Sequence, residues 1–141
     1  MVRRGPRARV LTASVLVIAL STVLAGCGAD VERQQAGVAA DTFSTDVTTD
    51  PGAACALLAP RAEQAVAEDG TSCATALPEE DLPAQGKRTS VAVAGHSAQV
   101  RYAKGTVFLS LFDDGWRVVA AGCSRTSTDP AVPYDCVVDG S

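Results

Sequence analysis

The spacing of apolar residues changes about halfway along the chain. Between Gln35 and Val47 the apolar or small residues recur at steps of three and four, which is typical of one face of an α-helix. They are Ala36, Ala39, Ala40, Phe43 and Val47. We therefore predict an amphipathic helix over this stretch.

Shorter helices are predicted between this helix and about residue 77. Asp50 followed by a proline is typical of an N-cap and a first helical position. A further stretch begins at Pro60 and ends at Asp69-Gly70, because glycine commonly terminates a helix. Ser72, or the threonine before it, can cap one more turn. The prolines and acidic residues that follow predict a loop.

From about residue 87 to residue 121 the period is two, which predicts β-strands. Turn signals at Gly95-His96, Lys104-Gly105 and Asp114-Gly115 divide this stretch into four strands. Two-residue hairpins at these turns align apolar residues across the strands. The pairs are Val91 with Val100, Val93 with Ala98, Val100 with Leu109, Tyr102 with Val107, Leu111 with Val118, and Leu109 with Ala120.

These registers gather apolar side chains on one face of the predicted sheet. They are Val91, Val93, Val100, Val107, Leu109, Leu111 and Val118, with Tyr102 and Trp116 toward the margins. A sheet of this hydrophobicity must be covered, and the helices over residues 36–77 are the available cover. The predicted fold class is therefore α+β, with short helices packed on one face of a four-stranded antiparallel meander.

The opposite face of the predicted sheet mixes aromatic and basic side chains. Arg101 is expected opposite Phe108, and Phe112 opposite Arg117, where cation–π contacts contribute about 0.5–1 kcal/mol. Two interpretations stay open. Either the segment Cys123–Ser141 folds back over the phenylalanines, or these four residues form a partner-binding surface, since aromatic residues and arginine are enriched at interface cores.

The N-terminal residues have the organisation of an export signal. Four arginines precede an apolar run that is shorter than the ~20 residues of a membrane span. The run ends in Leu24-Ala25-Gly26-Cys27, which resembles the lipobox of bacterial lipoproteins. That resemblance implies cleavage after Gly26 and a diacylglycerol thioether on Cys27. The alternative is an ordinary secretory signal followed by a cysteine that joins a disulfide.

These features predict three parts. Residues 1–26 are a lipoprotein signal peptide, residues 27–35 a lipidated, flexible polar tether, and residues 36–141 a single domain. Acyl chains such as palmitate would anchor this domain at the extracytoplasmic face of the cell membrane, because two chains bury enough methylene groups for stable attachment.

Four cysteines lie beyond Cys27, and an even number in an exported chain favours disulfides. We favour Cys55 with Cys73 and Cys123 with Cys136, because each pair brackets one local segment. The second pair would close the C-terminal segment 122–141. Zinc binding is the alternative, and the lack of a C-x-x-C motif argues against it.

The net charge and the motifs of the sequence argue against several classes of function. Removing residues 1–26 leaves 8 basic and 16 acidic residues, a net charge of about −8, which argues against binding to nucleic acid or to an anionic lipid surface. His96 and Asp113-Asp114 fall in predicted turns, and the acidic run Glu79–Asp81 lacks the alternating ligands of a calcium loop. Phosphate loops, dinucleotide fingerprints and nucleophile elbows are absent from the sequence. We therefore expect no enzyme activity, metal or cofactor.

Several segments together resemble small lipoproteins of high-GC Gram-positive (actinobacterial) bacteria whose exported domain is a minimal NTF2-like, or cystatin-like, α+β roll. They are the lipobox, Ala54–Pro60, Ser72-Cys73 and Phe112–Val118. The resemblance spans about Ala36 to Gly122. It implies helices packed on a curved sheet, with a pocket between them that some members use for ligands or isomerase chemistry.

Two functions follow as hypotheses. The first is a non-enzymatic, lipid-anchored accessory module of the cell envelope that binds another envelope protein, or a second copy of itself, through the outer sheet face. The acidic residues Glu79–Asp81 are a second candidate contact. The alternative is a module that binds a small apolar ligand between the helices and Val100, Leu109 and Trp116.

Overall fold

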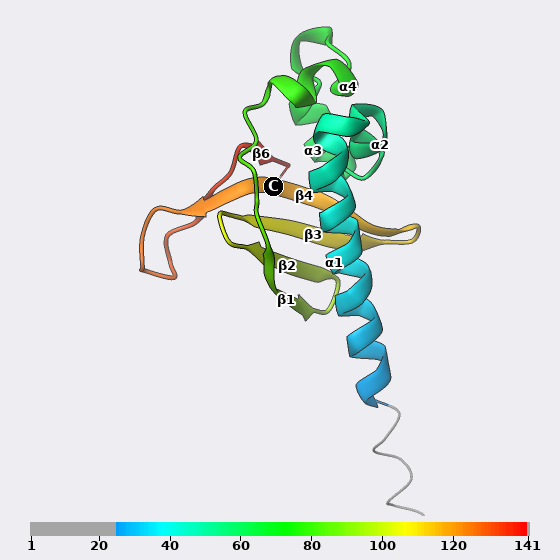
Figure 1. Cartoon of the computed structure of the whole chain (residues 1–141), viewed down its shortest axis with the longest axis vertical. Coiled ribbons are helices and arrows are strands. Elements are labelled where there is room, and N and C mark those ends of the chain that lie inside the picture. Colours follow the sequence, from blue (N-terminus) through cyan, green and yellow to red (C-terminus); the bar gives the residue numbers. More distant parts are fainter. Residues whose placement is uncertain (1–24, 141) are drawn as a thin grey trace, which may run out of the picture.

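The structure is a computed structural model that describes residues 25–140, without the side chains of residues 25–27 and Asp69. One long helix, α1 (Ala25–Thr49), crosses one face of an antiparallel sheet, and shorter helices gather beside its C-terminal end (Figure 1). The α+β class predicted from the sequence is confirmed. We call the sheet face toward α1 the inner face and the opposite one the outer face.

Helix α1 starts about ten residues earlier than the sequence pattern indicates. The prediction of a flexible tether before residue 36 is wrong, because this segment is helical and docked. Glu32 Oε2 accepts a hydrogen bond from the indole Nε1 of Trp116 at 3.0 Å, and Arg33 pairs with Asp30. Glu, Arg and Gln are good helix formers, but a polar segment without an apolar stripe carries no periodic signal.

The short helices begin at the residues that the sequence marks. α2 (Pro51–Ala56) is capped by Asp50, whose Oδ1 accepts a hydrogen bond from the backbone N–H of Ala53 at 3.1 Å. α4 (Cys73–Ala76) is capped in the same way by Ser72. The remaining helical elements are α3 (Pro60–Val66), η1 (Glu68–Gly70) and η2 (Leu77–Glu79).

The sheet has more strands than predicted. Its main strands are consecutive neighbours: β1 (Arg88–Ala94), β2 (Ser97–Tyr102), β3 (Thr106–Phe112) and β4 (Gly115–Arg125). The C-terminal segment adds β5 (Tyr134–Asp135) and β6 (Val138–Asp139), which both pair with β4. The backbone of Leu57 and Ala59 also bonds to that of Val118, so helices and C-terminal segment together cover this edge of β4.

The strand registers were predicted correctly for β1–β2 and wrongly for the other two hairpins. Val91 faces Val100 as expected, but Val100 faces Val107, and Leu109 faces Val118. The β2–β3 connection has three residues rather than two, and the β3–β4 turn is Asp113-Asp114, one residue earlier than expected. Between β2 and β3, and along β4 up to Val118, each error shifts the pairing by two residues, so the side chains keep their predicted faces. Beyond Val118, β-bulges interrupt the β3–β4 register: Ala120, expected opposite the inner-face Leu109, faces Phe108, and Ala121 is buried in the core.

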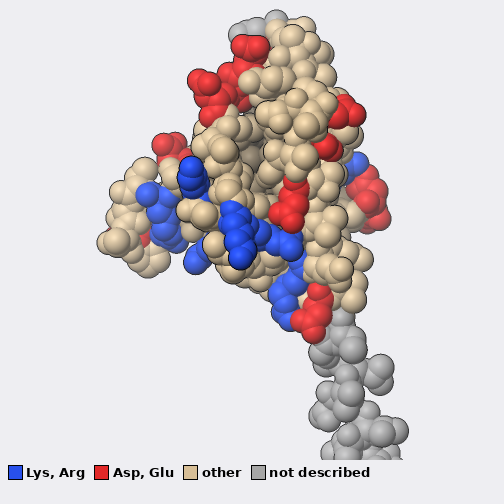
Figure 2. Space-filling view, viewed as in Figure 1, with Lys and Arg blue, Asp and Glu red and all other residues tan. Residues whose placement is uncertain are grey.

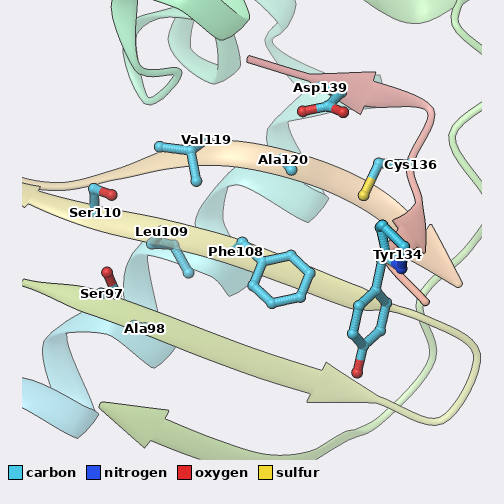
Figure 3. A pocket seen from close by; sticks show the side chains of 11 residues that line it. Ser97, Ala98, Phe108, Leu109, Ser110, Val119, Ala120, Tyr134, Cys136 and Asp139 are labelled. Carbon is cyan, nitrogen blue, oxygen red and sulfur yellow. The ribbon is translucent and has the colours of Figure 1, made fainter. Parts of the chain in front are cut away.

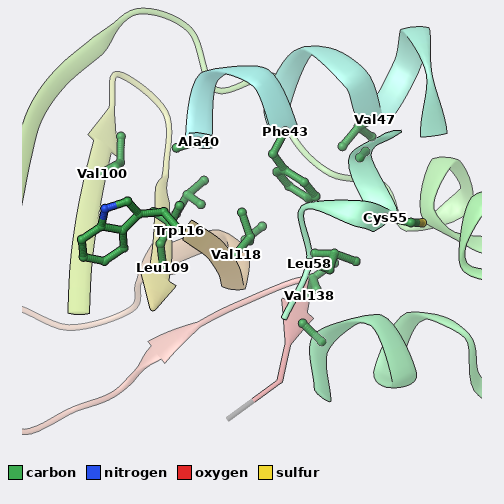
Figure 4. Packing of buried hydrophobic residues seen from close by; sticks show 14 of the residues in the cluster. Ala40, Phe43, Val47, Cys55, Leu58, Val100, Leu109, Trp116, Val118 and Val138 are labelled. Atoms are coloured by element: carbon green, nitrogen blue, oxygen red, sulfur yellow. The ribbon is translucent and has the colours of Figure 1, made fainter. Parts of the chain in front are cut away.

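The core lies between the helices and the inner face (Figure 4). Fully buried side chains come from α1, from the chain around α2, and from the sheet: Phe43, Leu58, Val100, Val107, Leu109 and Val118. Val91, Val93 and Leu111 pack against this cluster and are half-buried. Trp116 and Tyr102, expected at the margins, are buried. The predicted cover of helices on one sheet face is therefore present.

Both disulfides have the predicted pairing. Cys55–Cys73 joins α2 to the start of α4, and Cys123–Cys136 joins β4 to the C-terminal segment. The second bond holds that segment beside the sheet, close to the candidate site.

Candidate functional site

The C-terminal segment covers only part of the outer face. Phe108 is half-buried, and its ring lies edge-on to that of Tyr134 with 5.0 Å between the centroids. Phe112, at the other end of the same strand, is 40% exposed. Arg101 is also exposed. The C-terminal segment thus reaches Phe108 and leaves Phe112 exposed, and partner binding through this face stays a prediction.

The predicted cation–π pairs on the outer face are wrong because the strand registers differ. Phe108 faces Gln99, and Arg117 faces Ser110. Arg117 instead pairs with Asp114, and it donates a hydrogen bond to the carbonyl of Ala56 at 2.9 Å. Arg117 therefore holds the end of α2 against the sheet and is not a free partner-binding residue.

The ion pair of Arg117 changes the titration of both groups. The hydrogen bond to Arg117 is the main cause that lowers the pKa of the Asp114 carboxyl, and the same bond raises the pKa of the Arg117 guanidinium. Asp114 is exposed and Arg117 is half-buried, and an ion pair with this much access to solvent adds little stability. The two groups therefore stay charged at neutral pH.

A groove of about 360 Å³ lies on the outer face beneath the C-terminal segment (Figure 3). Its floor is the sheet, with Phe108 and Val119 among the largest side chains. Tyr134, Cys136 and Asp139 contribute from the C-terminal segment. The remaining lining residues are Ser97, Ala98, Leu109, Ser110, Ala120 and Pro133.

A second, cationic hollow of about 400 Å³ adjoins the same tyrosine. Arg101, Lys104 and Arg125 line it together with Tyr134. None of these three cations forms a salt bridge with a carboxylate in the described part of the chain. The guanidinium of Arg125 lies 4.6 Å from the centroid of the Tyr134 ring.

The pKa of the Tyr134 phenol is lowered by the positive charges of this hollow. Burial acts to raise its pKa, but hydrogen bonds with Arg125 and Gln99, together with the charges of Arg125 and Arg101, lower the pKa overall. The amide Nε2 of Gln99 lies 3.0 Å from the phenol oxygen. The positive charges of Arg125 and Arg101 would also stabilise an anion bound beside this hydroxyl.

Three residues of this site, Tyr134, Arg125 and Lys104, were not predicted from the sequence. β5 and β6 have two residues each, too short for any periodicity to be visible. The sequence feature that indicates this part of the site is the predicted Cys123–Cys136 disulfide, because it brings the C-terminal segment back to β4.

The interior region proposed for an apolar ligand is filled by side chains. Val100, Leu109 and Trp116 are at most 5% exposed and pack in the core cluster with Phe43 and Leu58 (Figure 4). The groove beside Phe108 lies on the opposite face of the sheet.

The other candidate groups lie apart from this site. His96 and Asp113 are exposed in turns, and Glu79 and Asp81 are exposed at η2. Among residues 25–140, no group of three or more His, Cys, Asp or Glu side chains is placed to hold a metal ion. In the same range no helix has the length and apolarity needed to cross a bilayer.

Residues 1–24 of the predicted signal peptide, which include the first lipobox residue Leu24, lie outside the described part of the chain, and so do the side chains of residues 25–27. Comparison with protein-family models, with curated proteins and with solved structures found no match to this chain. The resemblance to small actinobacterial lipoproteins therefore stays a prediction from the sequence.

Proposed function

We propose that the chain is an exported, lipid-anchored and non-enzymatic accessory protein of the cell envelope, which binds a partner protein through the outer sheet face. We also propose that its helix-on-sheet core is a minimal NTF2-like, or cystatin-like, roll. The observation that carries the binding role is the contrast between the two faces. Helices bury the inner face, whereas Phe112 and Arg101 stay exposed on the outer one.

The anchoring role is supported by the cationic and apolar N-terminal segment that ends at Cys27. Because Cys27 lies in the first turns of α1, and Glu32 of the same helix bonds to Trp116, an acyl anchor there would be joined to the domain by a helix. A helical link holds the domain closer to one orientation than a flexible tether would.

The anchor is tested with Cys27→Ala in the full chain, expressed in a bacterium that processes lipoproteins. We expect the wild type in the membrane fraction, with diacylglycerol on Cys27 by mass spectrometry, and the variant without lipid and released from the membrane. An unmodified Cys27 in membrane-bound wild type would contradict the lipid anchor.

The docking role is tested by photo-crosslinking in the native envelope. A benzoylphenylalanine at position 112 should give a discrete adduct, whereas one at the exposed Ala74 of α4 should not. An adduct of twice the chain mass would identify a second copy as the partner. Equal labelling from both positions would argue against a specific outer-face contact.

A second candidate function is small-ligand binding, and one observation favours it. The groove of about 360 Å³ beside Phe108 falls within the ~300–1,000 Å³ typical of ligand sites. It replaces the interior region between helices and sheet as the place where such a ligand would lie.

A further inference from the structure

We propose that the groove and the cationic hollow together bind one acidic amphiphile, a molecule with an apolar body and a carboxylate, sulfonate or phosphate head. The body would lie in the groove beside Phe108 and Val119, and the head among Arg101, Lys104 and Arg125. This binding needs neither the lipid on Cys27 nor a protein partner.

The groove suits an apolar body of limited size. Phe108 and Val119 line it, and both are only half-buried, so a ligand would remove further apolar surface from water. Disulfide Cys123–Cys136 and the edge-on contact of Tyr134 with Phe108 hold the covering segment in place. A preformed site of this kind loses little free energy to ordering when it binds.

The cations are within reach of a head group at the groove mouth. Gln99 faces Phe108 across the sheet, and Arg101 follows two residues later on the same face of β2. Diagonal neighbours on a sheet face are about 7–8 Å apart, within reach of a long side chain. Lys104 and Arg125 line the same hollow as Arg101, and no described carboxylate forms a salt bridge with any of the three.

Tyr134 joins the two parts of the site. Its ring contacts Phe108, which lines the groove, and the guanidinium of Arg125, which lines the hollow, lies over the same ring. Its hydroxyl bonds to Gln99, which lies between Phe108 and Arg101 on the outer face. A ligand that extends past Tyr134 therefore passes from apolar to positively charged surroundings.

The cations at one end of the site determine which way an acidic amphiphile would lie. The Asp139 carboxylate lines the groove from β6, away from the Tyr134 hydroxyl (Figure 3). Arg101 and Arg125, at the Tyr134 end, attract an acidic head. The head group is thus expected at the Tyr134 end of the groove.

The test uses anilinonaphthalene sulfonate, which has an aromatic body and a sulfonate head, and a chain that starts at residue 28. Among the residues whose burial the structure describes, every buried core residue lies between Ala36 and Val138, so a chain from residue 28 keeps this core. We expect saturable binding by fluorescence and a raised melting temperature. The raised melting temperature separates site binding from dye uptake by a partly unfolded chain.

The head-group variant is Arg101→Gln with Lys104→Gln. It should weaken binding of the dye by about tenfold, the size expected for lost charge-assisted contacts. The matched control, Arg33→Gln with Arg61→Gln, removes the same charge from α1 and α3 and should change binding by less than about twofold. Equal weakening by both variants would overturn the assignment, because net charge alone would then explain it.

Competition separates the two parts of the site. Decanoate should displace the dye, whereas octyl glucoside and inorganic phosphate should not. Displacement by octyl glucoside as effective as that by decanoate would overturn the role of the cations, and displacement by phosphate alone would overturn that of the groove. Amide NMR shifts should centre on Ser97–Arg101 and Tyr134–Cys136. Shifts centred on Val38 of α1 would contradict the site.

These outcomes are independent of the proposed lipid anchor and of the proposed protein docking, and they deepen the second candidate function, ligand binding in the groove. Loss of the Phe112 crosslink or of the Cys27 lipid would leave dye binding unchanged. Failure of dye binding would leave the crosslink and the lipid in place.

Discussion

At the scale of single residues, a buried tyrosine ties the long helix to the sheet. The Tyr102 hydroxyl donates to Asp41 Oδ1 at 2.8 Å, and Asp41 Oδ2 pairs with Arg88 Nη1 at 2.9 Å. The ring is 8% exposed. Burial first, and then the hydrogen bond to Asp41, raise the pKa of the Tyr102 phenol. The sequence placed Tyr102 at the edge of the inner face but gave no sign of its carboxylate partner.

This raised pKa predicts a loss of stability in alkaline solution. The unfolded phenol releases its proton near pH ~10, whereas the folded one keeps it, so stability is full below that pH and falls as the pH rises above it. Urea unfolding at about pH 8 and about pH 11 should show a larger drop for wild type than for Tyr102→Phe. The lowered pKa of Tyr134 acts in the opposite direction, but it is common to both proteins. An equal drop in both would contradict the prediction.

The two outer-face phenylalanines should respond differently to substitution. Phe108→Ser removes a half-buried ring and its contact with Tyr134, and should lower the free energy of unfolding by about 1–2 kcal/mol. Phe112→Ser changes an exposed ring, and the effect should be within about 0.5 kcal/mol. Denaturant unfolding measures both. A large loss for Phe112→Ser would show that its ring is a structural contact.

At the scale of elements, the first turns of α1 are held by a tertiary contact. Trp116 is 5% exposed, and Glu32 is the acceptor for its indole N–H. Residues 25–35 lack the apolar repeat that marks the rest of the helix. The helix therefore extends to Ala25 with support from a partner on β4, not from its own pattern alone.

Removing this acceptor should loosen the start of the helix. Glu32→Ala leaves a buried indole N–H unpaired, which costs about 1–3 kcal/mol. Amide hydrogen exchange over residues 28–35 should become faster, and Gln34→Ala, at an exposed position of the same helix, is the control. Unchanged protection in Glu32→Ala would mean that the segment is helical without the contact.

The disulfide between α2 and α4 stabilises a region of very short helices. Cys55 and Cys73 are 18 residues apart, and a loop of this length corresponds to about 3 kcal/mol of stabilisation. Cys55→Ala with Cys73→Ala should lower the free energy of unfolding by about this amount in denaturant titrations. Reduction of the Cys55–Cys73 bond in wild type should produce a similar loss, and no change in the double variant would contradict the prediction.

At the scale of the whole molecule, charge is distributed unevenly. On the face shown in Figure 2, cations gather over the sheet, whereas carboxylates lie toward the short helices and at several places beside the sheet. The sequence gives a net charge of about −8 once residues 1–26 are removed, which on its own argues against binding an anion. The structure separates the charges, so an anion can meet a local positive field on a protein that is negative overall.

Much of the fold was predictable because it depends on local features. Asp50 and Ser72 cap helices through contacts within three residues, and alternation along each strand fixes its faces. The hairpin registers were less secure, since they depend on turn length. The three-residue connection at Ala103–Gly105 could not be told from a two-residue turn, although the error left each face intact.

The sequence by itself determined the α+β class, the starts of the short helices, the inner and outer faces of most of the sheet and the disulfide pairing that it favoured, because each follows from neighbouring residues or from a fixed period. Only the tertiary structure decided the candidate site. Gln99 and Tyr134 are 35 residues apart, and their contact depends on how the C-terminal segment returns along β4. Two-residue strands carry no pattern, so their positions are set by pairing and by the Cys123–Cys136 bond.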